Sequence, residues 1–183
     1  MHRRKLLDLI AEYETVHPGE GDTVERFRTF INTHMLCFER DCWDGHITGS
    51  AWVIDPGGTD VLLTHHKKLD IWVQLGGHSD GESDTPQVAL REANEEGGVP
   101  VSFVSPAIFD LDVHEIPARK NDPAHYHYDV RFAFYAEHRE FVVSEESNDL
   151  AWVALDRLAD FSQEQSMLRM AEKWFNPTRN YKR

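Results

Sequence analysis

The sequence predicts a mixed α/β (α+β) fold, in which helices pack on a mixed β-sheet. Apolar residues recur with helical spacing near the N-terminus, and from Ile47 the pattern becomes strand-like. Pro86 in a first turn and Gly97-Gly98 as a stop indicate a further helix within the strand-like part. The resulting order of helix pair, strands, helix, strands and helix is typical of a sheet covered by helices. A length of 183 residues suffices for one such domain with an appendage.

Residues 1–45 are expected to form an N-terminal helical extension of two helices. The first covers residues 3–16, and His17-Pro18-Gly19 ends it because proline and glycine disfavour helix continuation. The second begins near Asp22 or Thr23, either of which can cap it. The apolar residues that share one side are Leu6, Leu7, Leu9, Ile10 and Tyr13 in the first helix, and Val24, Phe27, Phe30 and Ile31 in the second.

From Ile47 onward the spacing is that of strands, and residues 46–183 are expected to form the main domain. The turn Asp55-Pro56-Gly57-Gly58 joins the first two strands as a hairpin. Gly97-Gly98 ends the helix in the middle of this domain. The expected elements are strands at 47–55 and 59–66, a short run at 70–75, a glycine loop at 76–81, a helix at 86–97, strands at 101–115, 124–137 and 149–154, and a helix at 162–175.

Charge and cysteine content argue against several classes of protein. A formal charge of -13 disfavours a nucleic-acid polymer or an anionic membrane as partner, because both require a basic surface. Cys37 and Cys42, even with His46, lack the second ligand pair of a zinc motif, so free thiols are expected. No run approaches the about 18 apolar residues of a membrane span. Asp8 and Glu12 interrupt any signal-peptide core, so a cytoplasmic setting is expected.

The segment 76–99 reads GGHSDGESDTPQVALREANEEGGV and contains the most informative cluster of charges. Glu92, Glu95 and Glu96 stand at i, i+3 and i+4, so their carboxylates project from one face of a helix turn. Three neighbouring carboxylates repel each other, and a hard dication such as Mg²⁺ would remove that repulsion while keeping waters for substrate phosphates. The glycines ahead of the helix let the backbone approach a ligand, and their carbonyls can join the metal shell.

This segment resembles the Nudix box, in which a glycine precedes a glutamate by six positions and a closing Arg-Glu-(apolar)-x-Glu-Glu-x-Gly-(apolar) run follows. Gly77 opens the pattern, and residues 91–99 match the closing run at every specified position. Ser83 stands where the box has its first glutamate. Glu82, one residue earlier, or Asp84 could substitute for it. The difference concerns the loop and the number of metals more than the class of reaction.

The resemblance implies a Nudix-type α/β/α sandwich around a mixed sheet, with the box as loop, helix and loop. It also implies Mg²⁺-dependent hydrolysis of a diphosphate linkage in a nucleoside diphosphate joined to another moiety, with Mn²⁺ as an alternative ion. Glu92 would hold metal or act as the base for the attacking water, and Arg91 would pair with a loop carboxylate. The metal ligands implied within the box are the Gly76 carbonyl, Glu92, Glu95 and Glu96.

Residues 125–132, HYHYDVRF, form a second unusual stretch. On a strand, alternate polar residues of this run share one face and the aromatic residues share the other. The polar face could line the substrate cleft, with Arg131 on a phosphate and the histidines on base or sugar. A solvated sheet face and a histidine metal site are the alternatives. The residues expected to bind substrate are His78, His125, His127, Asp129 and Arg131.

Nudix proteins frequently supply a further acidic group from a loop that corresponds to residues 144–149. Glu145, Glu146 and Asp149 are the candidates, and Glu146 is the predicted additional metal ligand. The alternative is an ordinary acidic loop.

Two other functions compete with hydrolysis. A Nudix-like domain could sense a nucleotide metabolite without turnover, but such a sensor does not need the intact glutamate cluster. An isomerase of the isopentenyl diphosphate type would need a cysteine across the cleft, and neither Cys37 nor Cys42 lies in a segment expected there. The expected partner is a small nucleotide-type substrate. The N-terminal helices could cover the sheet, shape the pocket or mediate a homodimer.

Overall fold

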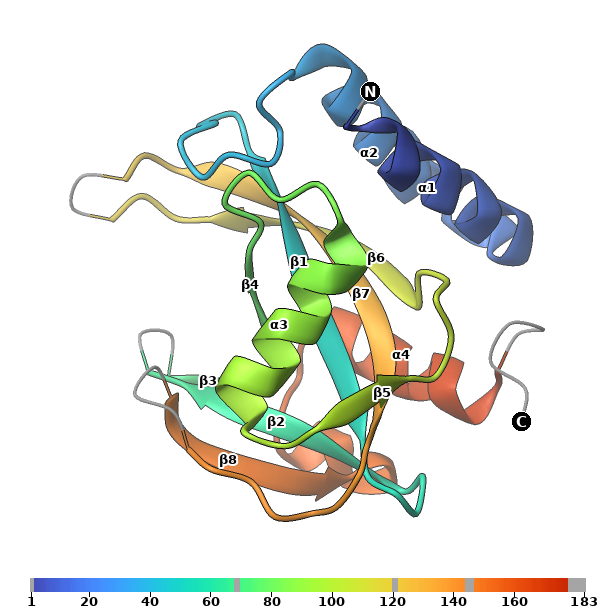
Figure 1. Ribbon diagram of the computed structural model, residues 1–183, viewed down its shortest axis with the longest axis vertical. Coiled ribbons are helices and arrows are strands. Elements are labelled where there is room, and N and C mark those ends of the chain that lie inside the picture. Colours follow the sequence, from blue (N-terminus) through green and yellow to red (C-terminus); the bar gives the residue numbers. More distant parts are fainter. Residues whose placement is uncertain (1, 68–69, 120–121, 144–146, 178–183) are drawn as a thin grey trace.

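The computed structural model describes residues 2–67, 70–119, 122–143 and 147–177. They form an α/β/α sandwich, in which a mixed sheet lies between helix α3 (Thr85–Gly97) on one face and helix α4 (Gln165–Phe175) on the other (Figure 1). Helices α1 (Arg4–Val16) and α2 (Gly21–Thr33) lie side by side, and α2 contacts strand β6. Short 3-10 helices occupy Pro18–Glu20 and Leu155–Asp160.

The sheet has eight strands, and β1 and β7 are its centre. These two strands run parallel, whereas the other pairings are antiparallel. The strand order is β3-β2-β1-β7-β5, with β4 also paired to β1, β6 to β7 and β8 to β2. The strands are β1 (His46–Ile54), β2 (Asp60–His66), β3 (Ile71–Val73), β4 (Leu75–His78), β5 (Val101–Phe103), β6 (Asp110–Ile116), β7 (His125–Ala136) and β8 (Ser147–Ala154).

The register of β1 against β7 determines which side chains share a face. Thr48 pairs with Asp129 across the two strands, so polar side chains of both strands point to the same side of the sheet. The next residue, Gly49, lies on the opposite side against α3, where a Cβ atom would approach Val88 to 2.8 Å. The two faces of the central strands therefore differ in chemistry: one is polar, and the other carries α3.

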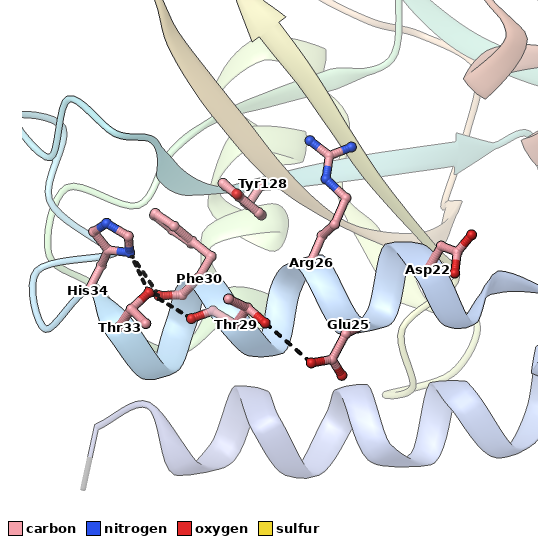
Figure 2. A pocket seen from close by; sticks show the side chains of 8 residues that line it. All are labelled: Asp22, Glu25, Arg26, Thr29, Phe30, Thr33, His34 and Tyr128. Carbon is pink, nitrogen blue, oxygen red and sulfur yellow. Dashed lines mark hydrogen bonds between the residues drawn. The ribbon is translucent and has the colours of Figure 1, made fainter.

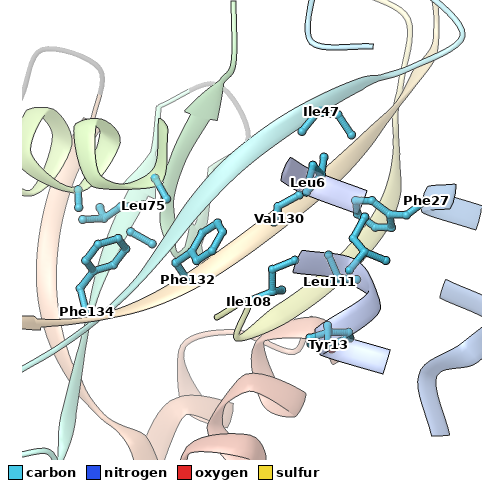
Figure 3. Packing of buried hydrophobic residues seen from close by; sticks show 14 of the residues in the cluster. Leu6, Tyr13, Phe27, Ile47, Leu75, Ile108, Leu111, Val130, Phe132 and Phe134 are labelled. Carbon is cyan, nitrogen blue, oxygen red and sulfur yellow. The ribbon is translucent and has the colours of Figure 1, made fainter. Parts of the chain in front are cut away.

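Buried apolar residues form two clusters. The first joins α1, α2 and α3 to the sheet, and Figure 3 shows Leu6 and Phe27 of the N-terminal helices close to Val130 and Leu111. The second lies around the fully buried Trp52 and includes residues of α4. The N-terminal helices thus share one hydrophobic core with the sheet.

The predicted order of helices and strands is confirmed, with two differences. The expected glycine loop at 76–81 instead begins as strand β4, because Gly76 lies flat against β1, where a Cβ atom would overlap the Oγ of Ser50. The expected strand at 101–115 divides into β5 and β6 around Pro106, which has no N–H for a sheet ladder. Cys37 and Cys42 are free thiols, as predicted. Within the described ranges, no helix is both long and apolar enough to cross a membrane.

Candidate active site

The helix of the box, α3, begins and ends where its sequence specifies. Pro86 lies in the first turn, where its missing N–H is tolerated. Gly98 adopts the left-handed conformation with φ of 57°, and its N–H donates to the Asn94 carbonyl at 3.1 Å. Contacts with β1 and β4 then hold α3 on the sheet. The glutamates in its last two turns are positioned by this packing.

Two of the three box carboxylates face the start of β4, and the third faces solvent. The N–H of Gly76 donates to Oε2 of Glu96 at 3.0 Å. The carboxylate of Glu92 lies directly over Gly77, because a Cβ atom there would approach its Oε2 to 2.5 Å. The side chain of Glu95 is 66% exposed. The carboxylates of Glu92 and Glu96 are therefore held at the junction of β4 and α3, and Glu95 is accessible beside them.

The carboxylate oxygens of the box and the backbone carbonyls beside them fit the Mg²⁺ ion that the sequence implies, because Mg²⁺ prefers carboxylate and carbonyl oxygens as ligands. Only glycine at position 77 leaves room for the Glu92 carboxylate, because any Cβ atom there would overlap it. Among the described residues, the three box carboxylates are not already gathered into one group of ligand atoms. A bound cation would draw the exposed Glu95 side chain toward the other two.

Arg91 fixes α3 to β4 through the main chain. Its Nη2 donates to the His78 carbonyl at 2.9 Å and to Oε1 of Glu92 at 2.8 Å. Its Nε lies 3.9 Å from Oε2 of Glu95. The loop carboxylate that the sequence suggested as its partner stays a prediction. Within the described residues Arg91 forms ion pairs with glutamates of its own helix, and a hydrogen bond to Glu92, together with the charges of Glu92, Glu95 and loop residue Asp80, raises the pKa of Arg91.

The carboxylates of the box loop bind elsewhere, mainly to the N-terminal segment. Asp80 forms a two-fold ion pair with Arg40, with distances of 2.8 and 2.7 Å. Asp84 accepts from Lys5 of α1 at 2.6 Å. Oε1 of Glu82 accepts from the N–H of Asp84 at 2.7 Å, which is a contact within the loop. The N-terminal extension therefore helps to set the shape of the loop that precedes helix α3.

Replacing Gly77 with alanine is expected to lower catalytic efficiency by up to about 100-fold with little change in thermal stability. The new Cβ atom would displace the flexible Glu92 carboxylate, and a displacement of about 1 Å at a reacting group costs rates of that order. Steady-state kinetics and a melting curve measure both quantities. Gly19→Ala is the matched control, because a Cβ atom there meets nothing within 4 Å. An unchanged rate for Gly77→Ala would show that the position of Glu92 is unimportant.

The polar face of β1 and β7 is a buried hydrogen-bond network centred on Asp129, which is 1% exposed. Its Oδ1 accepts from the hydroxyls of Thr48 at 2.9 Å and Ser50 at 2.7 Å. Its Oδ2 accepts from Gln74 at 3.2 Å and from Nε of Arg131 at 2.7 Å. The predicted sharing of one strand face by these residues is confirmed, but the face is buried where it contains Asp129 and Arg131.

Arg131 is 2% exposed and is surrounded by carboxylates. Besides Asp129, it reaches Asp110 at 3.1 Å and Asp112 at 3.5 Å. Burial alone would raise the pKa of Asp110, but a hydrogen bond from Arg169 and the charges around it hold that pKa below its usual value. These contacts give Arg131 a structural role. Direct contact with a phosphate, which the sequence suggested, stays a prediction and is not part of the function proposed below.

A cluster of imidazoles continues this polar face toward the start of β1. The ring centroid of His46 lies 4.8 Å from those of His125 and His127 and 5.0 Å from that of His78. Burial, reinforced by the neighbouring imidazoles, lowers the pKa of His46 to about 4 and that of His127 to about 2. Both rings are therefore neutral near pH 7. His114 lies 5.5 Å from His127 and contacts Asp112 through Nδ1.

Sequence reasoning did not single out His46, Thr48 or Ser50 as members of this face. The signal was present, since these residues alternate with Ile47 and Gly49 in the same two-residue pattern as residues 125–131. The predicted ligand Glu146, like Glu145, lies outside the described residues. Asp149, the third candidate, is exposed, and its Oδ1 accepts from its neighbour's N–H at 2.9 Å.

A pocket of about 500 Å³ lies along α2, away from the box (Figure 2). Phe30 stacks on Tyr128 in its wall, with ring centroids 3.9 Å apart. Neither the box carboxylates nor the histidine cluster lines it. Its lining residues are Asp22, Glu25, Arg26, Thr29, Phe30, Thr33, His34 and Tyr128.

Comparison with known proteins gives a family match. The family model of the NUDIX domain matches residues 44–174. The chain is 30% identical over 112 residues to a Mycobacterium tuberculosis protein provisionally named 8-oxo-dGTP diphosphatase 3, a match that covers 57% of this chain and 49% of that protein. The chain thus spans about half the length of the curated relatives it matches.

Solved structures share the fold. A NUDIX-family hydrolase from Clostridium perfringens superimposes with a TM-score of 0.55 at 23% identity, covering 72% of this chain and 97% of that one. The MutT protein from Methanosarcina mazei Go1 gives a TM-score of 0.55 at 16% identity, covering 74% and 96%. Together with the family match over most of its length, this shows that the chain belongs to the Nudix family.

Proposed function

We propose that this protein is a Mg²⁺-dependent Nudix hydrolase that cleaves a diphosphate linkage in a nucleoside diphosphate joined to another moiety. The observation that supports it most is the arrangement of the box, with Glu92 seated over Gly77 and Glu96 bound to the N–H of Gly76. A binding domain without turnover would have no use for carboxylates held in this way. Mn²⁺ is the alternative ion.

Glu95, Glu96 and the Gly76 carbonyl would hold the cation, with Glu92 as a further ligand or as the base. When bound, Mg²⁺ neutralises charge on the diphosphate oxygens and makes a water proton easier to remove. Glu92 would accept that proton; this role is supported by the hydrogen bond that Arg91 donates to its Oε1, which fixes the orientation of the carboxylate. Diphosphate hydrolysis needs mainly charge neutralisation and positioning; the cation that these residues would hold supplies the first, and the orientation of their side chains would supply the second.

The polar face beyond the box would bind the rest of the substrate. His78 follows the glycines of β4 directly, and its ring lies beside His127 at 5.2 Å between centroids. We propose that His78 contacts the base or sugar, and that Asp129 and Arg131 hold the sheet beside it. Contact of His125 and His127 with the substrate, which the sequence suggested, stays a prediction. The negative surface of the protein fits a small substrate that arrives with its cation.

The proposal is tested with a panel of nucleoside diphosphate derivatives, including modified nucleoside triphosphates and nucleotide sugars. Each is incubated with the full chain in Mg²⁺ or in excess chelator, and the products are resolved by chromatography. We expect cleavage between two phosphates of at least one compound, only with the cation present. Binding of a nucleotide without cleavage of any compound would instead support the sensor function and overturn the proposal.

Replacing Glu95 with glutamine is expected to lower the rate on that substrate at least about 10-fold, because one charged ligand of the cation is lost. Glu95 is exposed, so the melting temperature should stay unchanged. Glu172→Gln is the matched control: it removes the same charge from an exposed position on α4 and should leave the rate within about twofold. Equal rates for both variants would remove Glu95 from the site.

A further inference from the structure

The histidine cluster has the features of a second metal site, separate from the box. One potential ligand atom from each of His46, His125 and His127 lies within 4.8 Å of the other two. In the described part of the chain, this is the one group of three histidine, cysteine or carboxylate ligands drawn so close together. His125 and His127 are two residues apart on β7, and His127 pairs in register with His46 of β1. The central strands of the sheet therefore place the three rings together.

The hydrogen bonds of the cluster leave its lone pairs available. Nδ1 of His125 lies 2.8 Å from the Pro123 carbonyl, which can only accept, so Nδ1 carries the proton and Nε2 presents a lone pair. This backbone contact is the usual outer support of a metal-binding histidine. Among the described residues, three buried ring nitrogens have no hydrogen-bond partner: Nδ1 and Nε2 of His46 and Nε2 of His127. The Cys42 backbone lies near His46, but not in hydrogen-bonding geometry.

Burying these nitrogens without hydrogen-bond partners lowers the stability of the fold, so packing alone does not explain the cluster. His46 is 1% exposed, and a buried polar group without a hydrogen bond destabilises the fold. A metal ion with three neutral imidazole ligands would satisfy the orphaned nitrogens together. Ligand nitrogens around a tetrahedral zinc ion lie on the order of 3.3 Å apart. The three ligand atoms, which lie within 4.8 Å of one another, would therefore move closer together when zinc binds.

We propose that His46, His125 and His127 bind one zinc ion, at a site distinct from the carboxylate site for Mg²⁺. Imidazole nitrogens favour zinc and other borderline transition metals, whereas Mg²⁺ prefers oxygen, so the two sites select different ions. Three protein ligands would leave a fourth position open, and the ring of His78 lies near the cluster, with its centroid 5.0 Å from that of His46 and 5.2 Å from that of His127. Because the His78 carbonyl accepts from Arg91, the zinc site adjoins the box through a single residue of β4.

The test is direct binding of zinc to the full chain without a histidine tag, after removal of metals by a chelator. Calorimetry in millimolar Mg²⁺ is expected to give one equivalent of zinc, and Co²⁺ in its place should give the visible absorption of a tetrahedral nitrogen site. Free zinc at about 100 times its Kd should raise the melting temperature by about 5–10 °C.

His46→Leu separates this site from a merely structural cluster. It removes one ligand and replaces a ring without hydrogen-bond partners by an apolar side chain. We therefore expect the metal-free melting temperature to stay the same or to rise. Zinc affinity should fall at least about 100-fold, which is more than the loss of a residue that only supports a ligand would cause. His127→Gln is the second variant, for the case that His46→Leu does not fold. His138→Gln, at a half-exposed histidine just beyond the opposite end of β7 from His125, should keep full zinc binding.

Failure of this proposal is distinguishable from failure of the proposed hydrolase. Glu96→Gln should keep the zinc-dependent rise in melting temperature whatever its effect on activity. The proposal is overturned if wild type binds no zinc, if His46→Leu or His127→Gln binds zinc as tightly as wild type, or if Glu96→Gln abolishes binding. The last result would place the ion at the box carboxylates.

Discussion

Replacing Glu96 with glutamine is expected to lower the rate of diphosphate hydrolysis by about 10²–10³-fold, the scale of removing one preorganised electrostatic group. Glutamine retains an amide oxygen that can still accept from the N–H of Gly76, so the variant loses charge while the fold and the local hydrogen bond are kept. The lost charge weakens the hold on Mg²⁺ and leaves the developing charge on the substrate less neutralised. Initial rates over a range of Mg²⁺ concentrations measure the effect.

The Mg²⁺ dependence distinguishes a ligand from a residue that only supports the loop. A ligand should require a higher Mg²⁺ concentration for half-maximal rate and should not recover fully at saturation. The melting temperature of Glu96→Gln should stay within about 2 °C of wild type, since the substitution retains shape and a hydrogen-bond acceptor. A rate within threefold of wild type at saturating Mg²⁺ would exclude Glu96 from the cation site.

The box part of the candidate site could be predicted from the sequence because its pattern is local. The helix expected at residues 86–97 is found at Thr85–Gly97, and its glutamates depend only on helical spacing and on Gly98 as its end. The partners of those glutamates were less predictable. Arg91 reaches the His78 carbonyl only because β4 lies beside α3. The side chains of the loop between them do not predict this arrangement.

The burial of the polar network around Asp129 could not be predicted from the sequence. The alternation of residues 125–131 predicted a shared face correctly, yet it could not say that the face is buried. Burial follows from the pairing of β7 with β1, which brings Thr48 to Asp129 across 81 positions of chain. Such pairing depends on the whole sheet, whereas alternation is a property of one strand. For the same reason sequence analysis considered His46 only together with Cys37 and Cys42, whereas the structure also brings it to the histidines of β7.

Replacing Arg131 with methionine is expected to lower the free energy of unfolding by about 3–5 kcal/mol, because it leaves buried carboxylates without their cation. Asp129 would keep only neutral donors, from Thr48, Ser50 and Gln74. For a chain of this size that loss corresponds to a fall of about 6–20 °C in melting temperature. Chemical denaturation and melting curves measure it. Arg157→Met is the matched control, since its ion pair is solvent-exposed and should contribute at most about 1 kcal/mol.

A double variant separates the charge effect from lost packing. If the penalty in Arg131→Met comes from uncompensated charge, adding Asp129→Asn should restore a large part of the stability, since the amide oxygen can still accept from the two hydroxyls. A penalty unchanged by the second substitution would point to packing instead. The same variants decide what Arg131 does for the substrate. Loss of activity with an unchanged melting temperature would support the phosphate contact that the sequence suggested, whereas the 2% exposure of this side chain leads us to expect the reverse.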